Sequence, residues 1–131
     1  MSMSSYIDEL FIDPLENALD DIDNGKSIND VKEYINSKIF KYYFNDLIEK
    51  FMISTKNNYS INENLFYDEC DVNFKKKNDK FDSMLDNIYD IFNELYYSGD
   101  EIKSTKSQIK KIINKFNTLM RTRYFIEYFD N

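Results

Sequence analysis

Apolar residues recur at helical intervals over most of the chain, most regularly between residues 79 and 97. In that segment they follow one another at steps of one, three or four residues, which is the spacing of one face of an α-helix. Gly99 follows the segment and is a typical helix stop. We therefore expect a helix over 79–97 whose apolar face is formed by Phe81, Leu85, Ile88, Tyr89, Phe92, Leu95 and Tyr96.

A second apolar face begins shortly after this stop. Several Ser, Thr and Asp residues between 100 and 105 are suited to cap the start of a helix. The pattern predicts one helix over about 102–128, which would form a C-terminal hairpin with the helix over 79–97. Its apolar positions are Ile109, Ile112, Ile113, Phe116, Leu119 and Met120.

The N-terminal segment carries a similar pattern that Pro14 interrupts. Its apolar positions are Tyr6, Leu10, Leu15, Leu19 and Ile22. Either a first helix ends near Ile12 and a second begins with Pro14 in its first turn, or a single helix kinks there. Asn24 and Gly25 then favour a helix end followed by a turn.

A long helix is predicted in the middle of the chain. Ser27, with Asp30 three residues later, forms a capping pattern, and the apolar residues that follow cover more than one helical face. We expect a long central helix over about 28–53 that several other helices contact. A similar capping pattern predicts a short helix over about 61–70.

Composition agrees with a helical fold. Two glycines and one proline in 131 residues are few for the many tight turns of an all-β protein. Eleven Phe and eleven Tyr residues supply material for a core, which argues against general disorder in spite of a charged fraction of 31%. The sequence therefore predicts an all-α protein, a compact bundle of about five helices in a single domain over 1–131.

No segment indicates export or membrane insertion. The N-terminus lacks the basic start and apolar centre of a secretory signal. No run approaches the roughly 18 apolar residues of a membrane span. The single cysteine, Cys70, cannot form an internal disulfide. These features favour a cytoplasmic protein, in its source cell or in an infected host.

Charge is sorted along the chain, whose net charge is −7. Residues 103–126 carry seven basic side chains and no acid: Lys103, Lys106, Lys110, Lys111, Lys115, Arg121 and Arg123. Residues 61–102 carry eleven acids against four lysines, and five of these acids line one helical face: Asp79, Asp82, Asp86, Asp90 and Glu94. In a hairpin the two rows could neutralise each other, or one of them could bind a partner.

These patterns predict three candidate interfaces. The acidic row imitates the regular negative charge of a nucleic acid, so it is suited to a basic surface of a larger protein. The basic row could contact nucleic acid directly, although the net negative charge of the chain opposes this. The aromatic residues near the ends of the hairpin are suited to a partner protein or a homodimer: Tyr96, Tyr97, Tyr124, Phe125, Tyr128 and Phe129. For the cluster over 124–129, however, we favour burial against neighbouring helices over an exposed interface.

Missing residue types restrict the chemistry. Without histidine, Ser-His-Asp triads and His-ligated zinc sites are excluded, and one cysteine excludes thiolate zinc sites. Two separate glycines provide no glycine-rich phosphate loop. Acids at helical spacing, such as Glu16 with Asp20 or Asp82 with Asp86, could bind a metal, but acidic helices show this spacing by chance. We predict no catalytic residue, no cofactor and no metal.

The sequence thus favours a non-enzymatic protein-binding module, most specifically a small acidic inhibitor of the immunity or anti-defence type. The first alternative is a small nucleic-acid-associated regulator that uses the basic helix. The second alternative is a structural or assembly component of a virus or phage.

Overall fold

The computed structural model describes residues 2–51 and 70–129, with the side chains at 70–79 and 128 excepted. Over these residues the chain contains helices and no strand. The elements are α1 (Met3–Ile7), η1 (Asp8–Ile12), α2 (Asp13–Asp23), α3 (Ile28–Tyr34), η2 (Ile35–Phe44), α6 (Cys70–Tyr97), α7 (Ile102–Met120) and α8 (Arg123–Phe129). The elements η1 and η2 are π-helical, with wider turns than an α-helix.

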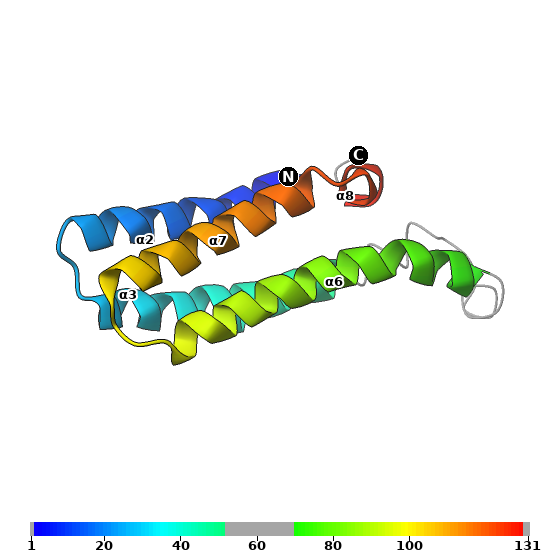
Figure 1. Cartoon of the computed structure of the whole chain (residues 1–131). Helices are drawn as coiled ribbons and strands as arrows, with labels where there is room; N and C mark the ends of the chain where they lie inside the picture. The colour runs from blue at the N-terminus through cyan, green and yellow to red at the C-terminus, as the bar shows by residue number, and fades with distance from the viewer. Residues whose placement is uncertain (1, 52–69, 130–131) are drawn as a thin grey trace.

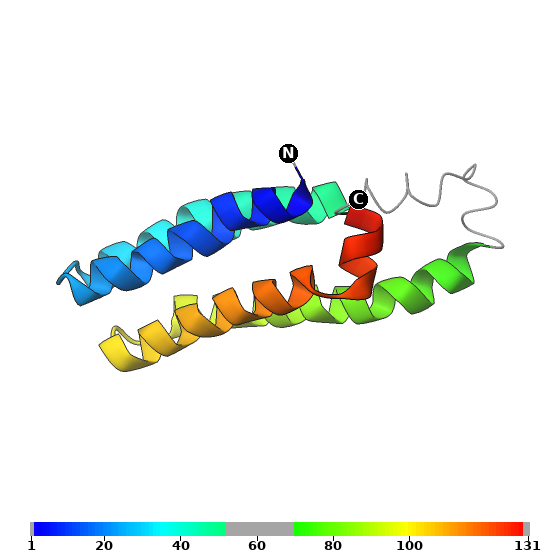
Figure 2. The same cartoon turned by 90° about the horizontal axis from the view of Figure 1, so that it is seen from above.

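The long helical segments that the structure describes form an antiparallel bundle (Figure 1). The first helix, α1–η1–α2, lies beside α7 and beside the second helix, which consists of α3, η2 and the helical residues up to Phe51. On the other side, α6 contacts both the second helix and α7 (Figure 2). The short α8 turns across the end of the bundle near the N-terminus (Figure 2). The prediction of an all-α bundle is confirmed.

One phenylalanine from each long segment meets in the centre of the bundle. Phe11, Phe44, Phe92 and Phe116 are all buried and come from the first helix, the second helix, α6 and α7. The rings of Phe11 and Phe116 lie 4.6 Å apart between centroids, and those of Phe44 and Phe92 lie 5.5 Å apart. Such tilted ring pairs contribute about 0.5–1.5 kcal/mol each beyond the area that they bury.

The first helix agrees with one of the two arrangements predicted at Pro14 and differs in its buried row. The π-helical η1 ends at Ile12 and α2 begins at Asp13 with Pro14 in its first turn, while the Asp13 amide donates to the Asp8 carbonyl, five residues back. The buried row begins one residue later than expected, at Ile7 and Phe11, and continues through Leu15, Ala18 and Ile22. The predicted positions Tyr6, Leu10 and Leu19 are only partly buried.

The second helix follows the prediction from Ile28 to Phe51, and the last two residues of the predicted range lie outside the described part. The Ser27 hydroxyl accepts a bond of 3.4 Å from the Asp30 amide, as the capping pattern predicts. Within η2 the buried positions Ile39 and Phe44 are five residues apart, which fits the wide π turns. The π geometry itself has no signal in the sequence that we can identify.

The C-terminal hairpin forms with different limits. Helix α6 begins at Cys70 instead of residue 79, and the predicted helix over 102–128 is divided into α7 and α8. Thr122 causes the division: its hydroxyl donates to the Leu119 carbonyl at 2.7 Å and accepts from the Phe125 amide at 3.2 Å. One side chain therefore ends α7 and caps the start of α8. The short helix expected over 61–70 falls outside the described part except for Cys70, which is the first described residue of α6.

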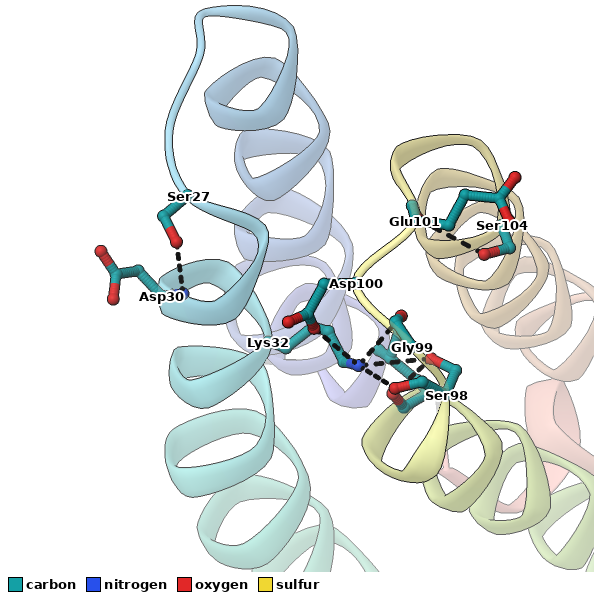
Figure 3. A network of polar contacts seen from close by, with 9 residues as sticks. Ser27, Asp30, Lys32, Ser98, Gly99, Asp100, Glu101 and Ser104 are labelled. Atoms are coloured by element: carbon teal, nitrogen blue, oxygen red, sulfur yellow. Dashed lines mark hydrogen bonds and ion pairs between the residues drawn. The ribbon is translucent and has the colours of Figure 1, made fainter.

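A buried lysine fixes the turn between α6 and α7 (Figure 3). Lys32 of α3 has an exposed fraction of 8%, and its ammonium donates to the Ser98 carbonyl at 2.5 Å and to the Gly99 carbonyl at 3.4 Å. The Asp100 carboxylate lies 3.5 Å away and balances the charge. A cation at the last carbonyls of a helix is favourable, because these groups lack partners and carry partial negative charge. Lys32 thus holds the C-terminal end of α6 against the second helix.

Candidate protein-binding surface

A groove of about 380 Å³ runs between η2 and the C-terminal half of α6. Its lining is mostly amide and phenol groups with one ammonium: Asn36, Phe40, Lys41, Asn45, Tyr89, Asn93, Tyr96 and Tyr97. One wall is the π-helical segment of the second helix, and π turns often occur at functional sites. The polar lining favours a ligand that hydrogen-bonds rather than a purely apolar one.

Packing beneath the groove holds its tyrosines at the surface. The ring of Phe40 stacks on Phe92 at 4.9 Å and meets the edge of Tyr89 at 5.2 Å. Tyr89 and Tyr96 keep 47% of their surface exposed, and Tyr97 keeps 81%. The Tyr89 ring, held in this way, loses little further freedom when a partner binds, which is one reason that tyrosine is common at binding hot spots.

The rings of the groove already contact a cation. The Lys41 ammonium lies 5.6 Å from the centroid of the Tyr96 ring, within the range of a cation–π interaction. The rings of Tyr96 and Tyr97 meet edge to face, with their centroids 4.8 Å apart. This part of the groove therefore presents aromatic faces together with a positive charge.

The acidic row lies on the outer face of α6, next to the groove. Asp82, Asp86, Asp90 and Glu94 are exposed, and the side chain of Asp79 lies outside the described part. Asp86, Asp90 and Glu94 repeat every four residues and make no ion pair with any side chain that the structure describes. Tyr97 follows three residues after Glu94, so carboxylates and an exposed ring share this surface. We call Asp86, Asp90, Glu94 and Tyr97 the outer face of α6.

In the ion pairs that the structure gives, the basic row of α7 and α8 does not pair with the acidic row of α6, as it could in a hairpin. Lys106 pairs with Asp23 of α2 at 2.5 Å, and Arg123 pairs with Glu127 of α8 at 2.7 Å. The side chains of Lys103, Lys110, Lys111, Lys115 and Arg121 are exposed. Because α7 lies between the first helix and α6, its cations are flanked by acidic helices on both sides.

The predicted aromatic interface is divided between the two ends of the bundle. Phe125 and Phe129 are buried, with exposed fractions of 0% and 9%, and Tyr124 is partly buried, while the side chain of Tyr128 lies outside the described part. Phe129 packs against Phe51 at a centroid distance of 4.8 Å. The 19 residues of α7, about 28 Å of helix, separate this end from Tyr96 and Tyr97. These residues therefore do not form one surface.

A polar cluster that the sequence did not indicate joins the first two helices. The Tyr6 hydroxyl donates to the Asp46 carboxylate at 2.5 Å, and the Lys50 ammonium lies 3.7 Å from that carboxylate. The same ammonium lies 5.4 Å from the Tyr6 ring. Burial of the phenol raises the pKa of Tyr6, and the bond to Asp46 raises it further. The cluster explains why Tyr6 stays at the edge of the core while Ile7 enters it.

Among the side chains that the structure describes, at 2–51, 80–127 and 129, no group of three or more Asp or Glu residues comes close enough together to hold a metal ion. None of the described helices has a stretch long and apolar enough to cross a bilayer.

No protein-family model, curated protein or solved structure matches the chain.

Proposed function

We propose that this protein is a non-enzymatic binding module that uses the outer face of α6 to cover a basic surface of a larger protein. The observation that carries the proposal is the set of exposed carboxylates of Asp86, Asp90 and Glu94, which make no ion pair in the described part of the chain and lie beside the exposed Tyr97. Carboxylates of this kind are available to lysines and arginines of a partner.

The chemistry of the outer face suits such a partner in two ways. Its negative charge, on a chain of net charge −7, speeds the approach of a basic protein. Tyr97 adds a large ring that can pack on the stem of a lysine or stack with a guanidinium. Carboxylates at a helical spacing also imitate the phosphates that many basic surfaces bind. An inhibitor of the immunity or anti-defence type would use both properties.

Affinity capture from the source or host lysate, followed by mass spectrometry, tests the proposal. We expect to recover a stoichiometric protein partner. The variant D86N/D90N/E94Q, in which three acids of the outer face are neutralised, should bind this partner with an affinity reduced by roughly tenfold or more. The matched control is E9Q/E16Q/D20N, which removes three exposed acids from the first helix and changes the net charge equally. Equal binding by the two triple variants would remove the outer face as the binding surface.

A second function, nucleic-acid binding, is favoured by the exposed lysines of α7. Lys103, Lys110, Lys111 and Lys115 make no ion pair in the described part. A fluorescence anisotropy titration with a DNA duplex at low salt tests it: K110A/K111A should weaken binding and reduce its salt dependence. We rank this function below protein binding, because the acidic helices beside α7 repel phosphates.

A further inference from the structure

The polar groups of the groove are of a kind that can pair with copies of themselves. The side-chain amide of Asn93 and the hydroxyls of Tyr89 and Tyr96 can each donate and accept hydrogen bonds. The Asn45 amide nitrogen already donates to the Lys41 carbonyl at 2.7 Å, which leaves its oxygen as an acceptor. An amide that meets a second copy of itself can form two hydrogen bonds. Such a lining therefore needs no partner of a different chemistry.

The charges beside the groove are opposite in sign and displaced from each other along it. Lys41 lies on the η2 wall, level with Tyr96, because its ammonium is 5.6 Å from that ring. Asp86 lies on α6, ten residues before Tyr96, which is about 15 Å along the helix. Neither side chain makes an ion pair within the described residues.

We propose that the groove is the interface of a symmetric homodimer. A twofold axis that enters the groove between these two charges, near Tyr89 and Asn93, exchanges the two ends of the groove and its two walls. Lys41 of each copy then meets Asp86 of the other, and the tyrosines and asparagines near the axis meet their own copies. A twofold interface requires this self-complementarity, in which residue i contacts j and j contacts i.

A second copy fits the charges better than a partner with one kind of charge. A uniformly basic segment in the groove would be repelled by Lys41, and a uniformly acidic one by Asp86. The partner must carry an acid opposite Lys41 and a base opposite Asp86, and this chain itself carries both at the required displacement. The proposal concerns the isolated protein and does not rest on the proposed function, although the two surfaces share Asp86 and Tyr97.

Sedimentation velocity of the purified protein over a wide concentration range tests whether the dimer forms. Variants that exchange the charges of Lys41 and Asp86 test whether these two residues meet in it. We expect a monomer–dimer equilibrium in the wild type. K41E and D86K each place like charges opposite one another, so each should raise the dimer Kd by about tenfold or more. The double variant K41E/D86K restores opposite charges at both contacts and should bring the Kd back towards the wild-type value.

Matched controls separate this effect from net charge. K111E and D20K make the same charge changes at exposed positions outside the groove, and both should leave the Kd unchanged. Lys41→Gln and Asp86→Asn should shift the Kd in the same direction by less, and circular dichroism should give the wild-type helical signal for every variant. A wild type that stays monomeric at the highest concentration, or a double variant no better than the single ones, would overturn the proposal.

Discussion

Two pairs of aromatic residues, one at each end of α7, differ in their burial. At one end, Phe125 and Phe129 of α8 are buried against the second helix and α6. At the other end, Tyr96 and Tyr97 remain exposed at the end of α6. The turns beside the two pairs also differ. Thr122 redirects the chain so that α8 folds across the bundle, whereas Lys32 holds the end of α6, where both tyrosines stay outside the core.

Aromatic content does not by itself identify an interface. The hydroxyl of a tyrosine can remain in water at no cost, whereas a phenylalanine ring gains most from complete burial. The two ends should therefore respond differently to mutation: the α8 end should affect stability, and the Tyr97 end should affect binding.

The largest expected effect is at Phe125. Phe125→Ala should lower the free energy of unfolding by about 3–5 kcal/mol, because it removes a fully buried ring and leaves a cavity. Tyr97→Ala should change it by less than about 0.5 kcal/mol, because that ring is 81% exposed. Urea denaturation followed by circular dichroism measures both. Similar losses in the two variants would contradict the comparison.

The next effect concerns the turn that leaves the tyrosines exposed. Lys32→Met keeps most of the side chain but leaves the Ser98 carbonyl without its charged donor. We expect a loss of about 1–3 kcal/mol in the same denaturation experiment. Lys38→Met, at an exposed position of the same helix, is the control and should be nearly neutral. Unaltered stability in Lys32→Met would mean that the buried lysine does not hold the turn.

A smaller effect is expected at the opposite turn. Thr122→Ala removes the hydroxyl that caps α8 and should cost about 1 kcal/mol. Thr122→Ser keeps the hydroxyl and should stay close to the wild type. Amide hydrogen exchange gives the location of the change: protection should fall in α8 and not in α7. Equal behaviour of the Ala and Ser variants would exclude the capping role.

The smallest expected effect on stability is at Tyr6, whose hydroxyl, unlike those of the exposed tyrosines, is partly buried and bonded to Asp46. Because its pKa in the folded protein lies above the ordinary value of 10.0, the neutral phenol is favoured by folding. This contribution is complete below about pH 10 and is lost as the pH rises further. Tyr6→Phe should cost at most about 1 kcal/mol at neutral pH and should reduce the loss of stability above pH 10. Denaturation curves at neutral and alkaline pH, with Tyr97→Phe as the control, measure it.

The fold class could be predicted because apolar spacing reports directly on helices. The long helix over 28–51 and the hairpin of α6 and α7 follow from that spacing together with the Ser27 cap and the stop at Gly99. The division at Thr122 was missed because apolar residues continue on both sides of it, so the pattern has no gap. The threonine is the one local signal, since its hydroxyl can both end one helix and begin the next.

The candidate surface could be predicted only in part. The acidic row was visible because its residues belong to one helix with a regular spacing. The groove was not visible, because Lys41 and Tyr96 come from helices far apart in the sequence that meet only after the bundle forms. The ion pair of Lys106 with Asp23 was not predicted for the same reason, because Asp23 lies on the first helix rather than in the hairpin.

The most direct test of the account is to map the contact with the captured partner on the protein by NMR. In a titration of isotope-labelled protein, the largest amide shifts should fall on residues 86–97, around the outer face of α6. D86N/D90N/E94Q should abolish these shifts, and E9Q/E16Q/D20N should leave them unchanged. Shifts concentrated on the lysines of α7, or on the first helix, would contradict the claim that α6 carries the binding surface.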